Sequence, residues 1–345
     1  MEIKVTNNTA IIYSSVRKKD DFFSSKFYID DFKILESLGL NVFFSNNILD
    51  FLNYKNYDKV LIYFYTKGFF VGLISKFFRK RVFYTGGIDY VDESKFLTIH
   101  NIFFVLCYVV SNNIFIVSKS DLNRAYNVLK RFKICGKKLI YNPHYINLRD
   151  VQDFKENCIF LKANNISGDD ILLTTICWRG VSENVYRKGL DLCLYVLKEL
   201  ILINSHYKLV IIGDGGKGDL IINELIIDLK LSNNVIITGR LDDDTKYYLL
   251  SKSKYYLQFS RYEGFGLAVL EAIASNCLVV HSNRGGLSET ISNRGLIIDI
   301  NDSPISIAYK IVNFYFDNSL LLKAKEFILS EYSFDQRSKI FNKYL

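Results

Sequence analysis

The 345-residue sequence lacks several features that would point to other classes of protein. It has only two prolines, Pro143 and Pro304, so it contains no proline-rich linker. The N-terminus has no basic start followed by a long apolar stretch, and we therefore expect no signal peptide. The most apolar run, IFFVLCYVV at 102–110, is shorter than the roughly 20 residues that span a bilayer.

Signatures of metal binding and of hydrolase chemistry are also missing. The six cysteines are scattered, with no C-x-x-C pair and no histidine at metal-ligand spacing, which predicts reduced thiols in a cytosolic protein. None of the four histidines has a serine or cysteine partner recognisable in the sequence, so a hydrolase triad is unsupported. No Asp-x-Asp follows a predicted strand in the second half, and Asp242-Asp243-Asp244 is typical of a helix start. We expect neither a catalytic metal nor a cofactor.

The positive charge of the chain is concentrated in its first half. Residues 1–150 carry 22 Lys and Arg against 13 Asp and Glu, whereas the remainder carries 22 against 23. Two dense clusters stand out, SKFFRKR around Lys76 and LKRFKICGKK around Lys130. Such clusters fit an anionic membrane surface, a nucleic acid or a phosphorylated ligand, and equally a solvated face. No nucleic-acid-binding motif accompanies them, so we expect no nucleic-acid partner.

Short apolar segments alternate with longer helical patterns along the whole chain, which predicts βαβ units and parallel sheets. Strands are expected in the first half at 10–14, 41–45, 59–65, 81–85, 114–118 and 138–142, with helices at 30–39 and 119–132. A second series follows, with strands at 170–178, 208–215, 234–240, 255–260, 277–282 and 295–300 and a helix at 188–201. The predicted fold class is α/β, with two doubly wound domains facing a central cleft.

Glycines and charged residues follow the predicted strands of the second half in turn. They are Arg179, then Gly213 to Gly216, Gly239 with Arg240, Glu263, and Gly285 with Gly286. Ligands of open parallel sheets bind beyond the carboxyl ends of the strands. These positions are therefore our candidate binding residues.

The stretch RYEGFGLAVLEAIASN at 261–276 holds two glutamates on either side of a helix start. Glu263 precedes Gly264-Phe265-Gly266, and Glu271 lies inside the helix that begins near Leu267. The first N–H groups of such a helix form an anion site for a phosphate. Each carboxylate can accept hydrogen bonds from a pair of hydroxyls, one on a sugar and one on a ribose. The alternative is that Glu271 caps a helix or pairs within the protein.

The segment EGFGLAVLEAIASNCLVVHSNRGGLSETI resembles the signature of retaining glycosyltransferases of family 4, which have the GT-B fold. The matching residues are Glu263, Glu271, Gly285, Gly286 and Glu289. ICWRGVSENVYRKGLDL resembles the family segment in which an arginine and a lysine bind the donor diphosphate, here Arg179 and Lys188. KLVIIGDGG, NVIITGRL and the ending SEYSFDQRSKIFNKYL resemble further family segments, so that the resemblance covers about 170–345.

This resemblance implies three parts of the chain: an acceptor-binding Rossmann-like domain at 1–150, a nucleotide-sugar-binding domain at 151–328, and a helix at 329–345 that crosses back. It implies that Arg179, Lys188 and Glu263 are catalytic. The donor would be bound by Gly213, Gly239, Arg240, Gly264, Phe265, Gly266, Leu267 and Glu271. Two cations suit the charge that develops on a departing diphosphate. The alternative for Arg179 and Lys188 is a surface salt bridge.

The first half departs from the family at its first loop. Family members often carry glycines there, whereas SSVRKKDDFFSS at 14–25 has none. Gly86, Gly87 and Asp89, which follow the predicted strand 81–85, are our candidates for acceptor binding. Asp89 is also a candidate catalytic residue, because it would orient the acceptor, and the alternative is a turn or cap residue. Ser118 is expected to cap a helix.

The sequence therefore predicts a glycosyltransferase that moves a sugar from a nucleotide-diphosphate donor, such as a UDP- or GDP-sugar, to a saccharide or lipid-linked saccharide. We expect it in the cytoplasm, peripheral on the inner face of the plasma membrane, in cell-surface polysaccharide synthesis. Two alternatives stay open: a nucleotide-sugar epimerase on the same fold, and a catalytically silent nucleotide-sugar-binding protein.

Overall fold

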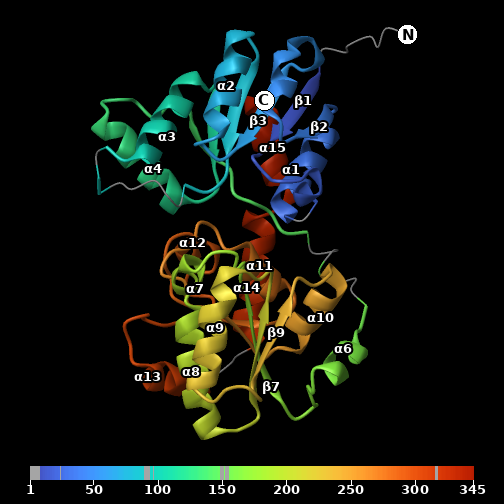
Figure 1. Ribbon diagram of the computed structural model, residues 1–345, viewed down its shortest axis with the longest axis vertical. Helices are drawn as coiled ribbons and strands as arrows, with labels where there is room; N and C mark the ends of the chain where they lie inside the picture. Colours follow the sequence, from blue (N-terminus) through green and yellow to red (C-terminus); the bar gives the residue numbers. More distant parts are fainter. Residues whose placement is uncertain are drawn as a thin grey trace. The chain divides into compact units, whose positions relative to one another are not determined.

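A computed structural model gives the structure of residues 8–23, 25–88, 94–95, 97–147, 151, 155–314 and 318–345. The chain forms two compact units, each with one parallel sheet. Unit 1 comprises Met1–Tyr145 and Tyr332–Leu345, and unit 2 comprises Ile146–Glu331. Both are α/β, as the alternation of apolar and helical segments predicts (Figure 1).

Unit 1 contains a six-stranded parallel sheet in the order β2-β1-β3-β4-β5-β6. Its strands are β1 (Thr9–Tyr13), β2 (Asn41–Ser45), β3 (Lys59–Tyr63), β4 (Arg81–Thr85), β5 (Asn113–Ile116) and β6 (Leu139–Tyr141). Its helices are α1 (Lys26–Ser37), α2 (Gly68–Phe77), α3 (Ile99–Val110), α4 (Lys119–Arg131) and α15 (Phe334–Tyr344). Short 3-10 turns are η1 (Lys19–Phe22), η2 (Ile48–Leu52) and η3 (Tyr54–Asn56).

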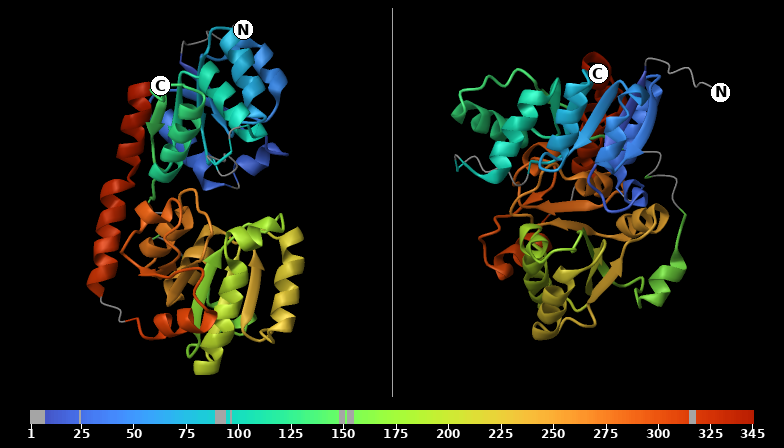
Figure 2. Two further views of the ribbon diagram at one scale, coloured as in Figure 1. Left: turned by 90° about the vertical axis from the view of Figure 1, so that its left-hand side faces the viewer. Right: turned by 45° about the horizontal axis from the view of Figure 1, so that its top comes forward.

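Both faces of the unit 1 sheet are buried, because neighbouring residues of one strand pack into different apolar clusters. Ile11 packs with Val60 and Phe104, whereas Ile12 packs with Leu61 and Phe341. Successive strand residues point to opposite faces, so an all-apolar strand marks a sheet that is covered on both sides. Helix α15, drawn in red at the C-terminus, packs with α1 on one of these faces (Figure 2).

Unit 2 contains a second six-stranded parallel sheet in the order β12-β11-β10-β7-β8-β9. Its strands are β7 (Ile171–Ile176), β8 (Tyr207–Ile212), β9 (Val235–Gly239), β10 (Tyr255–Gln258), β11 (Leu278–His281) and β12 (Leu296–Ile297). Its helices are α6 (Cys158–Ala163), α7 (Glu183–Arg187), α8 (Leu190–Ile203), α9 (Lys217–Asp228), α10 (Asp243–Lys252), α11 (Leu267–Ala274), α12 (Leu287–Thr290), α13 (Pro304–Val312) and α14 (Asn318–Glu331).

Two predicted helix starts are confirmed by their hydrogen bonds. Ser118 Oγ accepts the backbone N–H of Asp121 at 3.0 Å and caps α4. Asp242 Oδ1 accepts the N–H of Thr245 at 2.8 Å and caps α10, so this acidic run is a helix start. Such side-chain acceptors satisfy donors that have no partner inside the helix. Within the described residues, no helix is both long enough and apolar enough to cross a membrane.

Candidate active site

The strand-end residues of unit 2 gather at one edge of its sheet, because all of its strands run parallel. The strand order changes direction between β7 and β10, which are neighbours in space but not in sequence. Open α/β sheets bind ligands at such a switch point. Arg179 follows β7 and Glu263 follows β10, so two predicted catalytic residues flank this point.

Lys188 and Glu263 form an ion pair across the switch point. Lys188 Nζ donates to Glu263 Oε2 at 2.6 Å, with the lysine side chain 20% exposed and the glutamate side chain 10%. The pair is therefore only partly accessible, unlike the surface salt bridge considered as the alternative. An ammonium has three donors, and Glu263 takes one of them.

Gly189 explains how Lys188 reaches this position and corrects a sequence prediction. The sequence predicts one helix over 188–201, but α8 begins at Leu190, and Lys188 ends the preceding short helix α7. Gly189 adopts a φ of 71°, and a Cβ at this residue would lie 2.1 Å from the carbonyl oxygen of Phe259. The left-handed turn fits glycine alone and separates the two helices, which directs Lys188 toward β10.

Glu263 is held by further donors from its own strand and loop. Gln258 Nε2 donates to Glu263 Oε2 at 3.0 Å, and Ser260 Oγ contacts the same oxygen at 3.3 Å. Tyr256 Oη in turn donates to Gln258 Oε1 at 2.8 Å, which orients the amide so that its NH2 group faces the carboxylate. All three partners of Glu263 converge on Oε2. This fixes the carboxylate and directs its other oxygen, Oε1, away from these donors.

Arg179 is buried, with 1% of its surface exposed. Its Nε donates to Asp219 Oδ1 at 2.6 Å, and its Nη1 donates to the carbonyl of Cys177 at 3.2 Å. Asp219 also accepts the N–H of Gly216 at 3.0 Å, at the start of α9. The pair is partly buried, because the Asp219 side chain is 32% exposed and only the arginine is enclosed. Of the two predicted cations, Lys188 is the more accessible.

The charges of Lys188, Arg179 and Glu263 all act on the thiol of Cys177. Burial raises the pKa of Cys177 to about 11, while the positive charges of Lys188 and Arg179 act to lower it and Glu263 acts to raise it. The thiol is therefore protonated near neutral pH. All three predicted catalytic residues of unit 2 lie within electrostatic reach of this one side chain.

Glu271 lies inside α11 and pairs within the protein through one of its two carboxylate oxygens. Its Oε1 accepts from Lys246 Nζ at 3.0 Å and from Tyr247 Oη at 3.1 Å, both on α10. Burial acts to lower the pKa of Lys246, but the carboxylates of Glu271 and Asp243 raise it above its ordinary value. These contacts hold the carboxylate in place through Oε1.

The loop after β11 packs directly on the Glu263 loop. Gly286 donates its N–H to the carbonyl of Glu263 at 2.7 Å. Gly285 has a φ of 59°, and a Cβ there would lie 2.2 Å from the same carbonyl oxygen. Glycine is required at 285 because the two backbones approach so closely. The pair Gly285-Gly286 therefore supports the geometry of the Glu263 loop.

The remaining predicted donor residues lie around the same edge. Gly266 has a φ of 99° and directly precedes α11. The helix therefore begins just after Glu263, Gly264 and Phe265, as predicted. Phe265 itself is buried. Leu267 is the first residue of α11. On the other side, Gly213 donates to the carbonyl of Gly239 at 2.8 Å, and Arg240 Nη1 lies 3.5 Å from Asp214 Oδ2.

The predicted acceptor residues belong to unit 1. Gly86, with a φ of 108°, and Gly87 follow β4, and the N–H of Ile88 lies 3.5 Å from Asp121 Oδ2. Asp89 lies outside the described residues. In place of the family's glycine-rich loop, η1 and the start of α1 follow β1.

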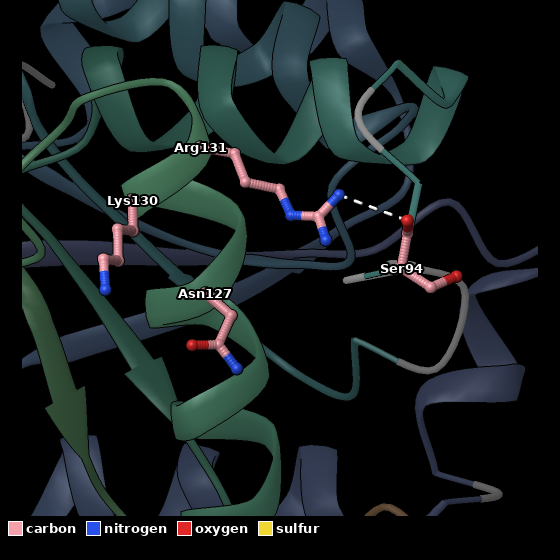
Figure 3. Close-up of a pocket in the computed structure, with 4 residues that line it drawn as sticks. All are labelled: Ser94, Asn127, Lys130 and Arg131. Atoms are coloured by element: carbon pink, nitrogen blue, oxygen red, sulfur yellow. Dashed lines mark hydrogen bonds between the residues drawn. The ribbon is translucent and has the colours of Figure 1, made fainter.

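A pocket of about 530 Å³ in unit 1 is lined by Ser94, Asn127, Lys130 and Arg131 (Figure 3). Arg131 Nη1 donates to the carbonyl of Ser94 at 3.2 Å across it. Gly86 and Gly87 are not among its lining residues.

Several residues of this site were not anticipated from the sequence. Gln258 is the one strongly polar side chain in the apolar strand YYLQ, and this signal could have identified it. Asp219 and Lys246 each pair with a charged residue tens of positions away, at 40 and 25 residues respectively. A buried charge requires a partner, but its identity depends on the folded arrangement.

Most of unit 2 matches a known protein family. Residues 181–328 match the family model "Glycosyl transferases group 1". The match includes Lys188, Glu263 and Glu271, and Arg179 lies two residues before it. The group 1 domain and the names of the relatives below support a transferase.

Among curated proteins, an uncharacterized glycosyltransferase of Methanocaldococcus jannaschii is 28% identical over 74% of this chain and 64% of its own length. O-antigen chain mannosyltransferase B of Escherichia coli is 32% identical over 28% of this chain and 25% of its own length. The chain thus matches less than two thirds of the length of these relatives.

Among solved structures, HepE of Anabaena in complex with UDP and glucose superposes with a TM-score of 0.73. It covers 97% of this chain and 98% of the other at 14% identity. The two parallel six-stranded sheets with their helices are those of the GT-B glycosyltransferase fold, which confirms the predicted fold class.

Proposed function

We propose that the protein is a retaining glycosyltransferase of family 4 that uses a nucleotide-diphosphate sugar. The observation that carries this proposal is the Lys188–Glu263 ion pair at the switch point, directly before the N-terminus of α11. It combines a cation for a diphosphate, N–H groups for a phosphate, and a fixed carboxylate for sugar hydroxyls. The UDP bound to the structurally similar HepE is consistent with such a donor.

The proposed reaction is a front-face displacement at the sugar carbon. The bond from that carbon to the donor phosphate breaks, the bond to the acceptor oxygen forms, and the departing phosphate oxygen takes up the acceptor proton. Lys188 stabilises the charge that develops on the diphosphate, and Arg179 supports it from its buried position. Glu263 Oε1 accepts hydrogen bonds from the sugar, because its donors within the protein occupy Oε2. No metal or cofactor takes part in this scheme.

The acceptor is proposed to be a saccharide or lipid-linked saccharide in cell-surface polysaccharide synthesis, of the O-antigen or capsule type. A relative of this chain carries the name O-antigen chain mannosyltransferase B. The enzyme would work in the cytoplasm at the inner face of the membrane, and the excess of Lys and Arg in residues 1–150 supports this placement. Gly86, Gly87 and Asp89 remain the proposed acceptor residues.

A thermal-shift panel of nucleoside diphosphates and their sugars tests the donor. At about 100 times its dissociation constant, a ligand that binds only the native state adds ~2.7 kcal/mol of stability. For a domain of this size we expect Tm to rise by roughly 5–10 °C with one base and little with the others. Nucleoside monophosphates should stabilise less, because they lack the second phosphate. Uniform melting with every nucleotide diphosphate would rule out the proposed donor site.

Product analysis separates the proposal from its two alternatives. An epimerase would change the sugar of the bound donor without any acceptor. A silent binding protein would show a thermal shift but neither transfer nor slow donor hydrolysis. The presence of Lys188, Arg179 and Glu263 at one sheet edge favours an active transferase over the silent protein.

Glu271 is proposed to bind the ribose of the donor. The wild-type protein should bind the 2′,3′-dideoxy form of its nucleoside diphosphate about 10–100-fold more weakly, because hydrogen bonds to a charged group are lost. Glu271→Gln should bind the two forms about equally, as measured by calorimetric titration. Glu224→Gln, an exposed glutamate on α9, is the matched control and should discriminate like the wild type. Undiminished discrimination in Glu271→Gln would assign the ribose to another residue.

A further inference from the structure

The exposed surfaces of α2 and α3 are apolar, although both helices belong to the outside of unit 1. On α2, Phe70, Leu73 and Phe77 are 50%, 47% and 78% exposed, at a spacing of three and four residues. On α3, exposed apolar side chains follow the same helical spacing: Ile99, Ile102, Leu106 and Val109. Residues three and four apart lie on one face of a helix, so each helix presents an apolar stripe.

The two stripes belong to neighbouring helices. Helix α2 packs against α3 (Figure 1). The ring centroids of Phe70 and Phe103 lie 6.4 Å apart. The turn η2 packs against α2 as well and adds exposed Leu49 and Leu52. We call the exposed side chains of η2, α2 and α3 the apolar face. Large contiguous apolar surfaces on soluble proteins mark interaction sites.

Positive charge borders the apolar face at the carboxyl ends of both helices. Lys76 and Arg79 are exposed at the end of α2. Lys138 Nζ donates to the carbonyls of Tyr108, Val109 and Ser111 at the end of α3. Burial lowers the pKa of Lys138, and the positive charge of Lys76 lowers it further.

Neither helix of this face contains an acidic residue, and the nearest ones in the sequence are Asp58, before β3, and Asp89, Asp92 and Glu93, before α3. Between Lys59 and Ile88 the sequence has six Lys and Arg and no Asp or Glu. Between Leu97 and Asn147 its one acidic residue is Asp121, which is fully buried. On η2, Asp50 contacts Ser45 Oγ at 2.6 Å. The two helices of the apolar face therefore combine apolar side chains with positive charge at their carboxyl ends and carry no negative charge of their own.

We propose that this apolar face and its basic border dock the protein on an anionic bilayer, with the aromatic and aliphatic side chains among the acyl chains and the lysines at the headgroups. The inference rests on the proposed function in that it names where such an enzyme meets a lipid-linked acceptor. Interfacial helices combine these two features, because apolar burial and attraction to anionic lipids add. A second copy of this face would bring no acidic side chain from α2 or α3 to the basic border, so a symmetric dimer would lack the charge complementarity that anionic lipids offer.

Co-sedimentation of the full chain with vesicles tests the proposal. We expect binding to vesicles that contain phosphatidylglycerol in phosphatidylcholine, weaker binding to phosphatidylcholine alone, and release at high salt. Lys137 is the exposed neighbour of Lys138 in the chain. Lys76→Glu combined with Lys137→Glu should weaken binding at least about tenfold, and so should Leu73→Ser combined with Phe77→Ser. These side chains are exposed, so the variants should fold like the wild type.

Matched control variants in unit 2 distinguish the face from charge or apolarity in general. Lys162→Glu combined with Lys198→Glu, and Leu202→Ser combined with Ile227→Ser, alter exposed side chains of the same types and should bind like the wild type. An equal loss of vesicle binding in the unit 2 controls and in the variants of the apolar face and its basic border would overturn the proposal. The proposal would also be overturned if the wild-type protein does not bind anionic vesicles. This includes the case in which the apolar face binds a second copy or another protein instead.

The nucleotide thermal shift separates this result from the proposed function. Variants of the apolar face should keep the wild-type shift, because their residues lie in unit 1 and the donor residues lie in unit 2. Vesicle binding without any nucleotide shift would remove the proposed donor while leaving the docking face supported. A thermal shift with a nucleotide but no vesicle binding would support the proposed donor site and overturn the docking face.

Discussion

Lys188→Ala is expected to lower the rate of sugar transfer by about 10²–10³-fold, the usual loss when one preorganised donor to a developing negative charge is removed. Lys188 Nζ lies 2.6 Å from Glu263 Oε2, so the change removes a cation and also loosens the carboxylate proposed to bind the sugar. Glu263 keeps its contacts with Gln258 and Ser260, and the backbone at Lys188 is shaped by Gly189, which is untouched. The measurement is kcat with saturating donor and acceptor.

Two controls separate a specific role of Lys188 from a general effect of losing a lysine or of misfolding. Lys198→Ala removes an exposed lysine from α8 and should leave transfer unchanged. Circular dichroism of Lys188→Ala should match the wild type, since the lysine is partly exposed. A variant with normal folding and full activity would show that Lys188 does not stabilise the leaving group. Arg179→Ala is a weaker test, because that buried arginine also pairs with Asp219 and its loss would disturb the fold.

Arg337→Met is expected to destabilise unit 1 by about 3–5 kcal/mol, because it leaves a buried carboxylate without its cation. Arg337 and Asp31 are 1% and 0% exposed, and the guanidinium binds both carboxylate oxygens, at 2.7 and 2.9 Å. It also donates to the carbonyls of Asn142 and Pro143. Burial acts to lower the pKa of Arg337, but Asp31 beside it raises it above its ordinary value, so the side chain stays charged.

Denaturation followed with two probes locates the effect. Trp178 is the only tryptophan and belongs to unit 2, so its fluorescence reports that unit, whereas far-UV circular dichroism reports both. In Arg337→Met, the dichroism signal should begin to fall at a lower denaturant concentration than the tryptophan fluorescence changes. Asp31→Leu combined with Arg337→Met should recover much of it, since no charge is then stranded.

Arg261→Met is the matched control for that experiment. It breaks a similar two-point pair with Asp191, but that arginine is 44% exposed, so we expect at most about 1 kcal/mol. Equal losses from Arg337→Met and Arg261→Met would contradict the importance of burial.

The sheets could be predicted well from the sequence because their strands are buried on both faces. Strands β2 and β4 have the predicted bounds of 41–45 and 81–85. The strand predicted at 295–300 is too long, since β12 covers only Leu296–Ile297 at the sheet edge. An edge strand has one neighbour, so its length depends on pairing that apolar composition does not encode.

Helix α2 was missed for a physical reason. A surface helix is normally identified by polar residues on its outer side, but GFFVGLISKF is apolar on both sides and begins with a glycine. For the candidate site, the sequence indicated Lys188, Glu263 and Glu271. It could not indicate that Lys188 meets Glu263, because that contact depends on β7 and β10 becoming neighbours.

The division of the chain has a consequence for its synthesis. Unit 2 is one continuous segment, Ile146–Glu331, whereas unit 1 takes its last helix from Tyr332–Leu345. On the ribosome, Asp31 and Tyr63 are made early, and Arg337 emerges only after all of unit 2. Until then the core of unit 1 lacks both this cation and Phe341. Unit 2 therefore has all its residues available for folding before unit 1, although most of unit 1 is translated first.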